Sequence, residues 1–285
     1  MTTESTHFLL FDAACSNYGG VSSKKRRIKR IVVTLTTLAG LLASAWVVDT
    51  SIAARSEKRL SDRVESIAEL AAAPEVYLGG FPFSAAMITG TLPDMYVSMT
   101  DVSVEPFGLL RAHTSLTDVD VSKEQLLAGD IDGSKAALIS RGVALDAVAL
   151  GSQLGISDLD ISHPYDISPA GGAVAEVRLT GTAPGWPGPV VVLAELRLVG
   201  KMFHLNPVQL IDRGLVPESG PNSHTEAQIL DAFRWELNTR TLPLARQASY
   251  VASNGGTIYF ESQERNVVVH TEDLIPKASD SNNPN

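Results

Sequence analysis

Hydrophobic residues first gather in one unbroken stretch near the start of the chain. Eighteen residues without a charge, Ile31 to Val48, follow the basic cluster Lys24 to Arg30. An α-helix of this length spans about 27 Å, close to the roughly 30 Å hydrocarbon core of a bilayer. Because Lys and Arg that flank a membrane segment stay in the cytoplasm, the pattern predicts a cytoplasmic leader over residues 1–30. It also predicts a membrane anchor over 31–48, with the remaining chain outside the cytoplasm.

A cleaved signal peptide is the alternative interpretation of the apolar segment. Ala43-Ser44-Ala45 has the small-x-small form of a cleavage site, and cleavage after Ala45 would release the protein to a periplasm-like space. Trp46 to Val48 instead continue the apolar run to spanning length, and Trp is enriched at membrane interfaces. We therefore favour the uncleaved anchor.

The leader itself carries little information. Its length leaves Met1 and Val21 as alternative starts of translation. Cys15 is the single cysteine of the chain and lacks the preceding apolar run of a lipoprotein attachment site. We therefore expect neither a disulfide nor a thiolate metal site outside the membrane.

The residues after the anchor change from helical to alternating periodicity. Residues 49–73 predict an amphipathic helix, which Pro74 ends. Its apolar stripe consists of Leu60, Val64, Ile67 and Ala71. Residues 74–275 predict one extracytoplasmic domain of the α+β class with long antiparallel strands, and the polar tail 276–285 is expected to be disordered. Alternation predicts strands over 75–83, 95–100, 110–121 with a bulge before Val119, 135–140, 175–180, 190–205, 233–237, and a hairpin of 257–261 with 267–270.

Two capping boxes and two further apolar patterns predict short helices in this domain. The boxes are Ser122 with Gln125, whose helix Gly129 closes, and Ser223 with Glu226. Apolar spacing adds helices over 143–154 and 244–252. The strand over 190–205 would measure about 53 Å if straight, far beyond the usual strand length, so we expect it to bend.

Charge narrows the range of partners. The chain has a net charge of −9. Residues 1–48 hold six of its 23 basic and two of its 32 acidic residues, which leaves 17 basic and 30 acidic residues beyond them. A domain this acidic is a poor nucleic-acid ligand and is not held on anionic lipid by charge. Any contact with lipid must rely on apolar burial.

The search for catalytic motifs finds only weak signals. Nucleophile elbows, P-loops, dinucleotide fingerprints and metal-binding histidine pairs are all missing from the sequence. The histidines beyond the anchor are scattered, at His113, His163, His204, His224 and His270. Asp158, Asp160 and Asp166 resemble a calcium loop or a glycosidase pair but lack the order of ligands that a calcium loop needs. We expect no catalytic residue, metal or cofactor, and a glycan-processing enzyme is the least favoured hypothesis.

Several predicted strands have one strongly apolar face, and methionines gather near the first of them. Methionine fits irregular apolar contents because its side chain is flexible. The candidate lining of an apolar groove is Met87, Met95, Val97, Met99, Val177, Leu179, Leu196, Leu198 and Met202. From the pattern alone, a closely packed core explains these residues better than a groove does.

A family resemblance reverses that preference. Four segments of the chain are similar to motifs of LmeA-type phospholipid-binding proteins of actinobacterial envelopes. They are Pro74-Glu75-Val76-Tyr77-Leu78-Gly79-Gly80-Phe81-Pro82-Phe83, the strand Met95 to Val104, the segment Thr241-Leu242-Pro243-Leu244, and the final Gly255 to Phe260. The resemblance covers residues 50–271 and departs over 183–222. It implies a long curved antiparallel β-sheet wrapped around a helix, with an apolar groove as in tubular lipid-binding proteins. It also implies a non-enzymatic role in envelope lipid handling, which in mycobacterial members bears on mannan elongation in lipomannan and lipoarabinomannan.

Two hypotheses from different classes follow. In the first, the protein holds the acyl chains of a phospholipid or lipoglycan precursor outside the membrane. In the second, it is a membrane-tethered, non-catalytic module that docks an envelope glycosyltransferase or division protein, and its apolar faces serve only its own core.

Overall fold

The computed structural model describes residues 20–68, 72–163 and 172–277. The chain divides into two compact units, Met1–Thr50 and Ser51–Asn285. Residues 1–19 of the predicted leader, Cys15 among them, and residues 278–285 of the predicted tail lie outside the described residues, as do Ala71 and Asp166.

One long helix, α1, runs from Gly20 to Ala68. Within the described ranges it is the one helix long and apolar enough to cross a membrane. In the first unit its apolar side chains are exposed, for example Leu41 and Leu42. The helix predicted over 49–73 is therefore a continuation of the apolar helix rather than a separate element.

In the second unit, the last turns of α1 present part of the predicted apolar stripe. Leu60 and Val64 are buried, and each contributes about 1.5–3 kcal/mol on burial. Ile67 is 45% exposed, so its place in the stripe is wrong. Ile67 borders a hollow that is otherwise lined by the polar residues Asp132, His270, Thr271, Glu272, Asp273 and Lys277.

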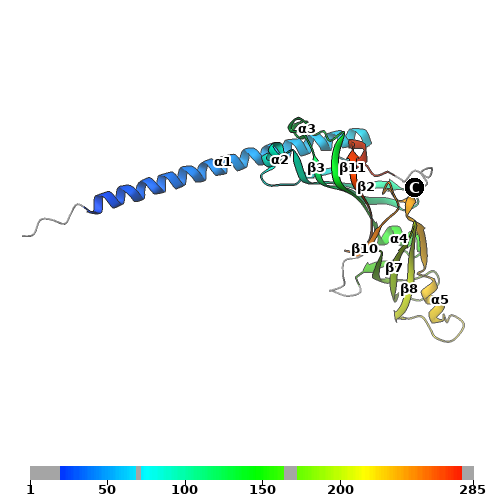
Figure 1. The fold of residues 1–285 in the computed structure, drawn as a ribbon. Coiled ribbons are helices and arrows are strands. Elements are labelled where there is room, and N and C mark those ends of the chain that lie inside the picture. Colours follow the sequence, from blue (N-terminus) through cyan, green and yellow to red (C-terminus); the bar gives the residue numbers. More distant parts are fainter. Residues whose placement is uncertain (1–19, 69–71, 164–171, 278–285) are drawn as a thin grey trace, which may run out of the picture. The chain divides into compact units, whose positions relative to one another are not determined.

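Two curled antiparallel sheets form the body of the second unit, which confirms the α+β class (Figure 1). The large sheet has the order β1-β2-β3-β4-β11-β10, and the small sheet has the order β5-β6-β7-β8-β9. The large sheet comprises β1 (Glu75–Leu78), β2 (Thr91–Val104), β3 (Gly108–Asp120), β4 (Ser134–Asp146), β10 (Tyr250–Asn254) and β11 (Thr257–Val269). The small sheet comprises β5 (Asp160–Ser162), β6 (Val174–Gly181), β7 (Val190–Val199), β8 (Met202–Asp212) and β9 (Trp235–Asn238).

Short helices connect the strands. They are α2 (Phe83–Thr89), α3 (Lys123–Ala128), α4 (Ala147–Leu154), α5 (Glu226–Asp231) and the 3₁₀ turns η1 (Thr239–Thr241) and η2 (Thr271–Leu274). The predicted capping box of Ser122 and Gln125 is confirmed, and Gly129 ends α3 in the left-handed conformation. The second box lies two residues later than predicted, at Thr225 and Gln228. Both boxes satisfy amide groups that the first helical turn leaves unpaired.

The single long strand predicted over 190–205 is wrong. A turn at Gly200 and Lys201 divides it into β7 and β8, which pair with each other. Gly200 has a φ of +57°, which glycine adopts without steric cost. The turn shifts the inward positions from even-numbered residues on β7 to odd-numbered residues on β8, so Leu198 faces inward beside Phe203 whereas Met202 pairs with Val199 on the opposite face. The longest strand is β2, with 14 residues.

Two other boundaries also differ from the prediction. Val143 to Asp146 extend β4, and α4 begins only where the Asp146 side chain accepts a hydrogen bond from the amide of Ala149. Val148, an apolar residue of the helix predicted over 143–154, is 80% exposed. Near the C-terminus, Tyr250 to Asn254 form a strand instead of part of a helix. The hairpin then joins β10 to a continuous β11.

Side-chain alternation reverses along one line across the large sheet. In β2, β3, β4 and β11, two consecutive side chains point outward at this line. In each pair of neighbouring strands, one residue of each strand is left out of the pairing there. We call the skipped residues Pro93, Asp118, Ala137 and Asn266 the step line. Asp118 and Asn266 have φ of +50° and +53°. The predicted bulge before Val119 is thus one part of an irregularity that four strands share.

Candidate functional site

The inner face of the large sheet carries two separate apolar clusters. The first, the helix-side cluster, packs against the end of α1 through Leu60 and Val64. It contains Met95, Val97 and Met99 of the predicted groove, all at most 2% exposed, with Met87 of α2 half-buried against it. Their spacing of two along β2 points them to one face, as the alternation predicts.

The second, the sheet-side cluster, fills the space between the large and the small sheet. It contains Val177 and Leu179 of β6 and Leu196 of β7, with Leu198 half-buried against it. Met202 is half-buried at the start of β8 and belongs to neither cluster. The structure therefore divides the predicted groove residues between two clusters instead of gathering them on one surface.

A row of buried polar side chains lies between the two clusters on β3, β4 and β11, whereas Val102 of β2 packs against both clusters. Thr114, Arg141 and Ser262 lie opposite one another on β3, β4 and β11. Along β4, Arg141 follows Ile139 of the helix-side cluster and precedes Val143 of the sheet-side cluster. We call these three residues the polar row. Sequence analysis missed Arg141 because it ended the strand at Ser140. The alternation of Ile139, Arg141, Val143 and Leu145 is the signal that would have found it.

Backbone carbonyls from two crossing segments accept the hydrogen bonds of the polar row. Thr114 donates to the carbonyl of Leu274 at 3.2 Å, and Ser262 donates to that of Leu244 at 2.7 Å. Arg141 Nε donates to the carbonyl of Asp273 at 3.1 Å, and its Nη2 lies 3.5 Å from the Asp273 carboxylate. Burial lowers the pKa of Arg141, an effect that Asp273 opposes.

The segment that crosses the polar row near the C-terminus is held at both ends. We call Thr271 to Lys277 the C-terminal strap. The Asp132 carboxylate accepts hydrogen bonds from the amide and the hydroxyl of Thr271, at 2.6 and 2.9 Å. The carbonyl of Lys277 accepts from the amide of Ala245 at 2.9 Å. Leu274 between them is fully buried in the helix-side cluster.

Comparison with known protein families decides the family of this fold. A model of the family described as LmeA-like phospholipid-binding matches residues 47–261, well over half of the chain. The chain belongs to the LmeA-like phospholipid-binding family. The predicted resemblance is thereby confirmed. No curated protein and no solved structure matches the chain.

The LmeA-like match covers Thr114, Arg141 and the strands that build both clusters, except for the part of β11 after Glu261. It ends at Glu261, one residue before Ser262 and ten before the C-terminal strap begins. The strap of this LmeA-like chain therefore lies outside the matched residues.

The carboxylates considered as catalytic in this LmeA-like protein have structural environments. Asp158 accepts hydrogen bonds from the amide and the hydroxyl of Thr182, at 2.8 and 2.7 Å, and these bonds lower its pKa. Asp160 is exposed at the start of β5, and Asp166 is outside the described residues. Within the described ranges, no group of three or more His, Cys, Asp or Glu residues is placed to hold a metal ion.

One histidine takes part in a network on the outer face of the large sheet. His113 Nε2 lies 2.8 Å from the hydroxyl of Tyr259, which donates to the Glu261 carboxylate at 2.8 Å. Ser140 also donates to Glu261. The Glu261 pKa is lowered although burial alone would raise it, because Ser140, Gln263 and Tyr259 donate to the charged form. This network lies on the other face of the sheet from both clusters.

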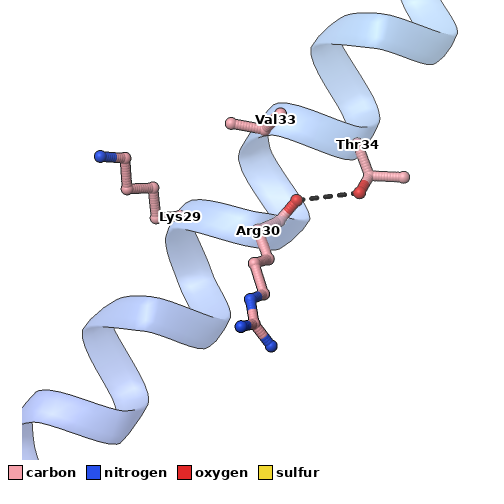
Figure 2. Close-up of a pocket in the computed structure, with 4 residues that line it drawn as sticks. All are labelled: Lys29, Arg30, Val33 and Thr34. Atoms are coloured by element: carbon pink, nitrogen blue, oxygen red, sulfur yellow. Dashed lines mark hydrogen bonds between the residues drawn. The ribbon is translucent and has the colours of Figure 1, made fainter.

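A second surface feature lies on α1 in the first unit. Lys29, Arg30, Val33 and Thr34 border a shallow hollow, and Thr34 donates to the Arg30 carbonyl at 2.9 Å (Figure 2). All four side chains come from one stretch of one helix, so the hollow has no opposing wall. Two cations at the edge of an exposed apolar run suit the headgroup region of a bilayer better than an enclosed ligand site.

Proposed function

We propose that this protein is a membrane-anchored phospholipid-binding protein that holds acyl chains outside the cytoplasm. Its role would lie in cell-envelope lipid or lipoglycan biogenesis, without catalysis. The observation that carries the proposal is the coincidence of a phospholipid-binding family match with two apolar clusters inside curled sheets. Acyl chains gain roughly 0.8 kcal/mol per buried methylene, so such clusters offer enough binding energy without headgroup charge.

The proposed acyl-chain contacts are the side chains predicted from alternation, apart from Met202, which lies on the outer face of the small sheet beside Val199. Most of them pack within one of the two clusters, so a bound acyl chain has to replace side-chain contacts inside that cluster. Leu198 is half-buried and is the first residue that a chain would meet in the small sheet. Met87 is likewise half-buried at the edge of the helix-side cluster and would be the first residue that an acyl chain meets there.

The proposed topology puts Lys29 and Arg30 at the cytoplasmic surface and the second unit on the opposite side. The apolar helix that follows them supports an anchor, and the net negative charge beyond it limits adhesion to anionic lipid. An anchored protein of this kind lifts or presents lipid near its own membrane, whereas a protein cleaved after Ala45 would carry lipid further.

The test is native mass spectrometry of the full chain, purified in detergent from a membrane-containing lysate. We expect phospholipid to remain bound in stoichiometric amounts and to be identified after extraction. A lipid-free mass, with no uptake from phosphatidylglycerol and phosphatidylethanolamine liposomes, would contradict the proposal.

A matched pair of variants locates the groove. Leu198 is half-buried against the sheet-side cluster, while its neighbour Val199 is exposed. Leu198→Glu should abolish lipid retention with the fold intact, and Val199→Glu should leave retention unchanged. Normal retention in folded Leu198→Glu would remove the small sheet from the proposed site.

The second candidate is a tethered module that docks an envelope glycosyltransferase or division protein. The close packing of Met95, Val97 and Met99 favours it, because side chains at most 2% exposed satisfy a core without any ligand. Absence of bound lipid together with a stable fold would make this the better explanation. Asp160→Asn with unchanged envelope glycans would count against the remaining hypothesis of a glycan-processing enzyme.

A further inference from the structure

Arg141 is a charged residue in the middle of an apolar inner face. Its side chain is only 10% exposed, and burying a guanidinium is costly unless it is fully paired. Its nearest carboxylate oxygen, on Asp273, is 3.5 Å away, at the long end for a charge-assisted bond. Glu264 also acts on Arg141 but forms its own ion pair with Arg246. Arg141 is therefore paired with Asp273 by a long ion pair rather than by the short, two-pronged contact that a guanidinium can make.

The polar row presents donors, and the acceptors come from outside the large sheet. Two hydroxyls and a guanidinium point to carbonyls of Leu274, Leu244 and Asp273. A phosphate group offers several anionic oxygens that can take the place of such carbonyls, and Arg binds phosphate oxygens in pairs. The row also lies between the two apolar clusters, where the polar part of a bound lipid would keep its acyl chains in apolar surroundings.

The C-terminal strap is packed on one side only. Inward it contributes Leu274 and two carbonyls to the polar row. Next to it lies a hollow of about 320 Å³, lined by strap residues with Ile67, Asp132 and His270. A segment with a packed inner side and a hollow beside it can move away without disrupting either sheet. The strap also lies beyond the residues matched to the family.

We propose that Thr114 and Arg141 of the polar row form the phosphate-binding subsite for an anionic phospholipid, and that the C-terminal strap occupies this subsite until lipid displaces it. This proposal rests on the proposed function. It adds that the bound lipid has an anionic phosphate headgroup and that the C-terminal strap competes with this headgroup for the same donors. Asp273 would leave together with the strap, so its carboxylate would no longer repel the phosphate group. Glu264 stays near the subsite, but Arg246 holds its charge.

The test compares two lipids that share their acyl chains and differ in phosphate. Dioleoylphosphatidylglycerol and dioleoylglycerol are titrated into the full chain in detergent, with bound lipid counted by native mass spectrometry. We expect the wild-type protein to prefer the phosphate-bearing lipid by about tenfold. Arg141→Met should reduce that preference to about one while dioleoylglycerol still binds, and Arg141→Lys should retain part of it.

A second pair of variants tests the strap and does not depend on how Arg141 variants fold. Asp132→Ala removes both bonds to Thr271, so it should raise the affinity for dioleoylphosphatidylglycerol about three- to tenfold. Asp158→Ala loses the same two kinds of bond, to Thr182, away from the strap. It should leave the affinity unchanged. Hydrogen exchange of residues 271–277 should accelerate when dioleoylphosphatidylglycerol binds, and not when dioleoylglycerol binds.

The outcomes separate this proposal from the proposed function. Failure of the wild-type protein to bind either lipid would overturn the proposed function. Equal binding of both lipids by wild type and Arg141→Met would overturn the phosphate subsite alone. The strap would not be a competitor of the lipid if two results came together. Hydrogen exchange of the strap would stay unchanged on lipid binding, and Asp132→Ala and Asp158→Ala would have the same affinity for dioleoylphosphatidylglycerol.

Discussion

His113 and Tyr259 form an offset stack above the backbone of β4, with 2.8 Å between Nε2 and the phenolic oxygen. Their rings lie nearly parallel, 2° apart, with centroids 5.3 Å apart. Because the Tyr259 proton goes to the Glu261 carboxylate, the imidazole must donate to the phenolic oxygen. Neutral His113 is therefore the tautomer protonated at Nε2.

The pH response of His113 follows from this environment. Burial lowers its pKa below the ordinary 6.5, while Glu261 acts in the opposite direction. Below pH 6.5 the unfolded chain takes up a proton that the folded protein does not, so the free energy of unfolding should fall until the folded pKa is reached. Nitrogen-15 NMR of the imidazole should show the Nε2–H tautomer and a midpoint under 6.5. A midpoint at or above 6.5 would contradict this assignment. His113→Asn should remove this part of the pH dependence.

Gly142 makes room for the two rings. A Cβ at this position would overlap the Tyr259 hydroxyl and the His113 ring. Gly142→Ala should therefore lower the free energy of unfolding by about 1–3 kcal/mol, as overpacking does, measured by urea denaturation. Ala137→Ser, at an exposed position of the same strand, serves as the control and should change little. Equal stability of both variants would show that the rings shift freely.

Acid should loosen the C-terminal strap. The amide of Thr271 is the main cause that lowers the pKa of Asp132 below its ordinary 3.8. The stabilisation is therefore present above pH 3.8 and is lost as pH falls through the lower folded value. Asp132→Asn should imitate that loss at neutral pH and speed hydrogen exchange at Thr271 to Leu274, whereas Asp158→Asn should not. Unchanged exchange in Asp132→Asn would mean that Leu274 alone holds the strap.

Membrane insertion should depend on the apolar part of α1. Leu41→Arg with Leu42→Arg places two charges in the segment, each costing about 2.5–3.5 kcal/mol near the bilayer centre. The double variant should lose carbonate-resistant membrane association. Val268→Arg, at an exposed apolar position of β11, should keep it. Retained association of the double variant would place the anchor elsewhere.

Sequence periodicity identified individual strands more reliably than their connections. Val177 and Leu179 are buried on β6 as alternation predicts, because the two faces of that strand have different surroundings. The turn at Gly200 was missed because Met202 extends the sequence spacing of Leu196 and Leu198, although the turn places Met202 beside Val199 on the opposite face. The end of β4 was misread because Val143 and Leu145 also fit a helical stripe, and only the cap at Asp146 marks the true boundary.

The candidate site was predictable only in part, and for a related reason. Alternation reports which face a residue occupies but not which other element covers that face. It therefore found Met99 and Leu196 without showing that they belong to different clusters. The contact of Arg141 with Asp273 joins residues 132 positions apart, and neither local spacing nor composition indicates such a pairing.

The step line has a consequence for how related chains can differ in length. Each of four strands shifts its inward positions by one residue at the same level, so their faces agree on both sides of the line. Deleting Asp118 alone would turn Val119 outward while Ala136 beside it stayed inward. Length changes at this level are therefore tolerated only when all four strands change together, and insertions and deletions among relatives should avoid these positions and collect in the loops.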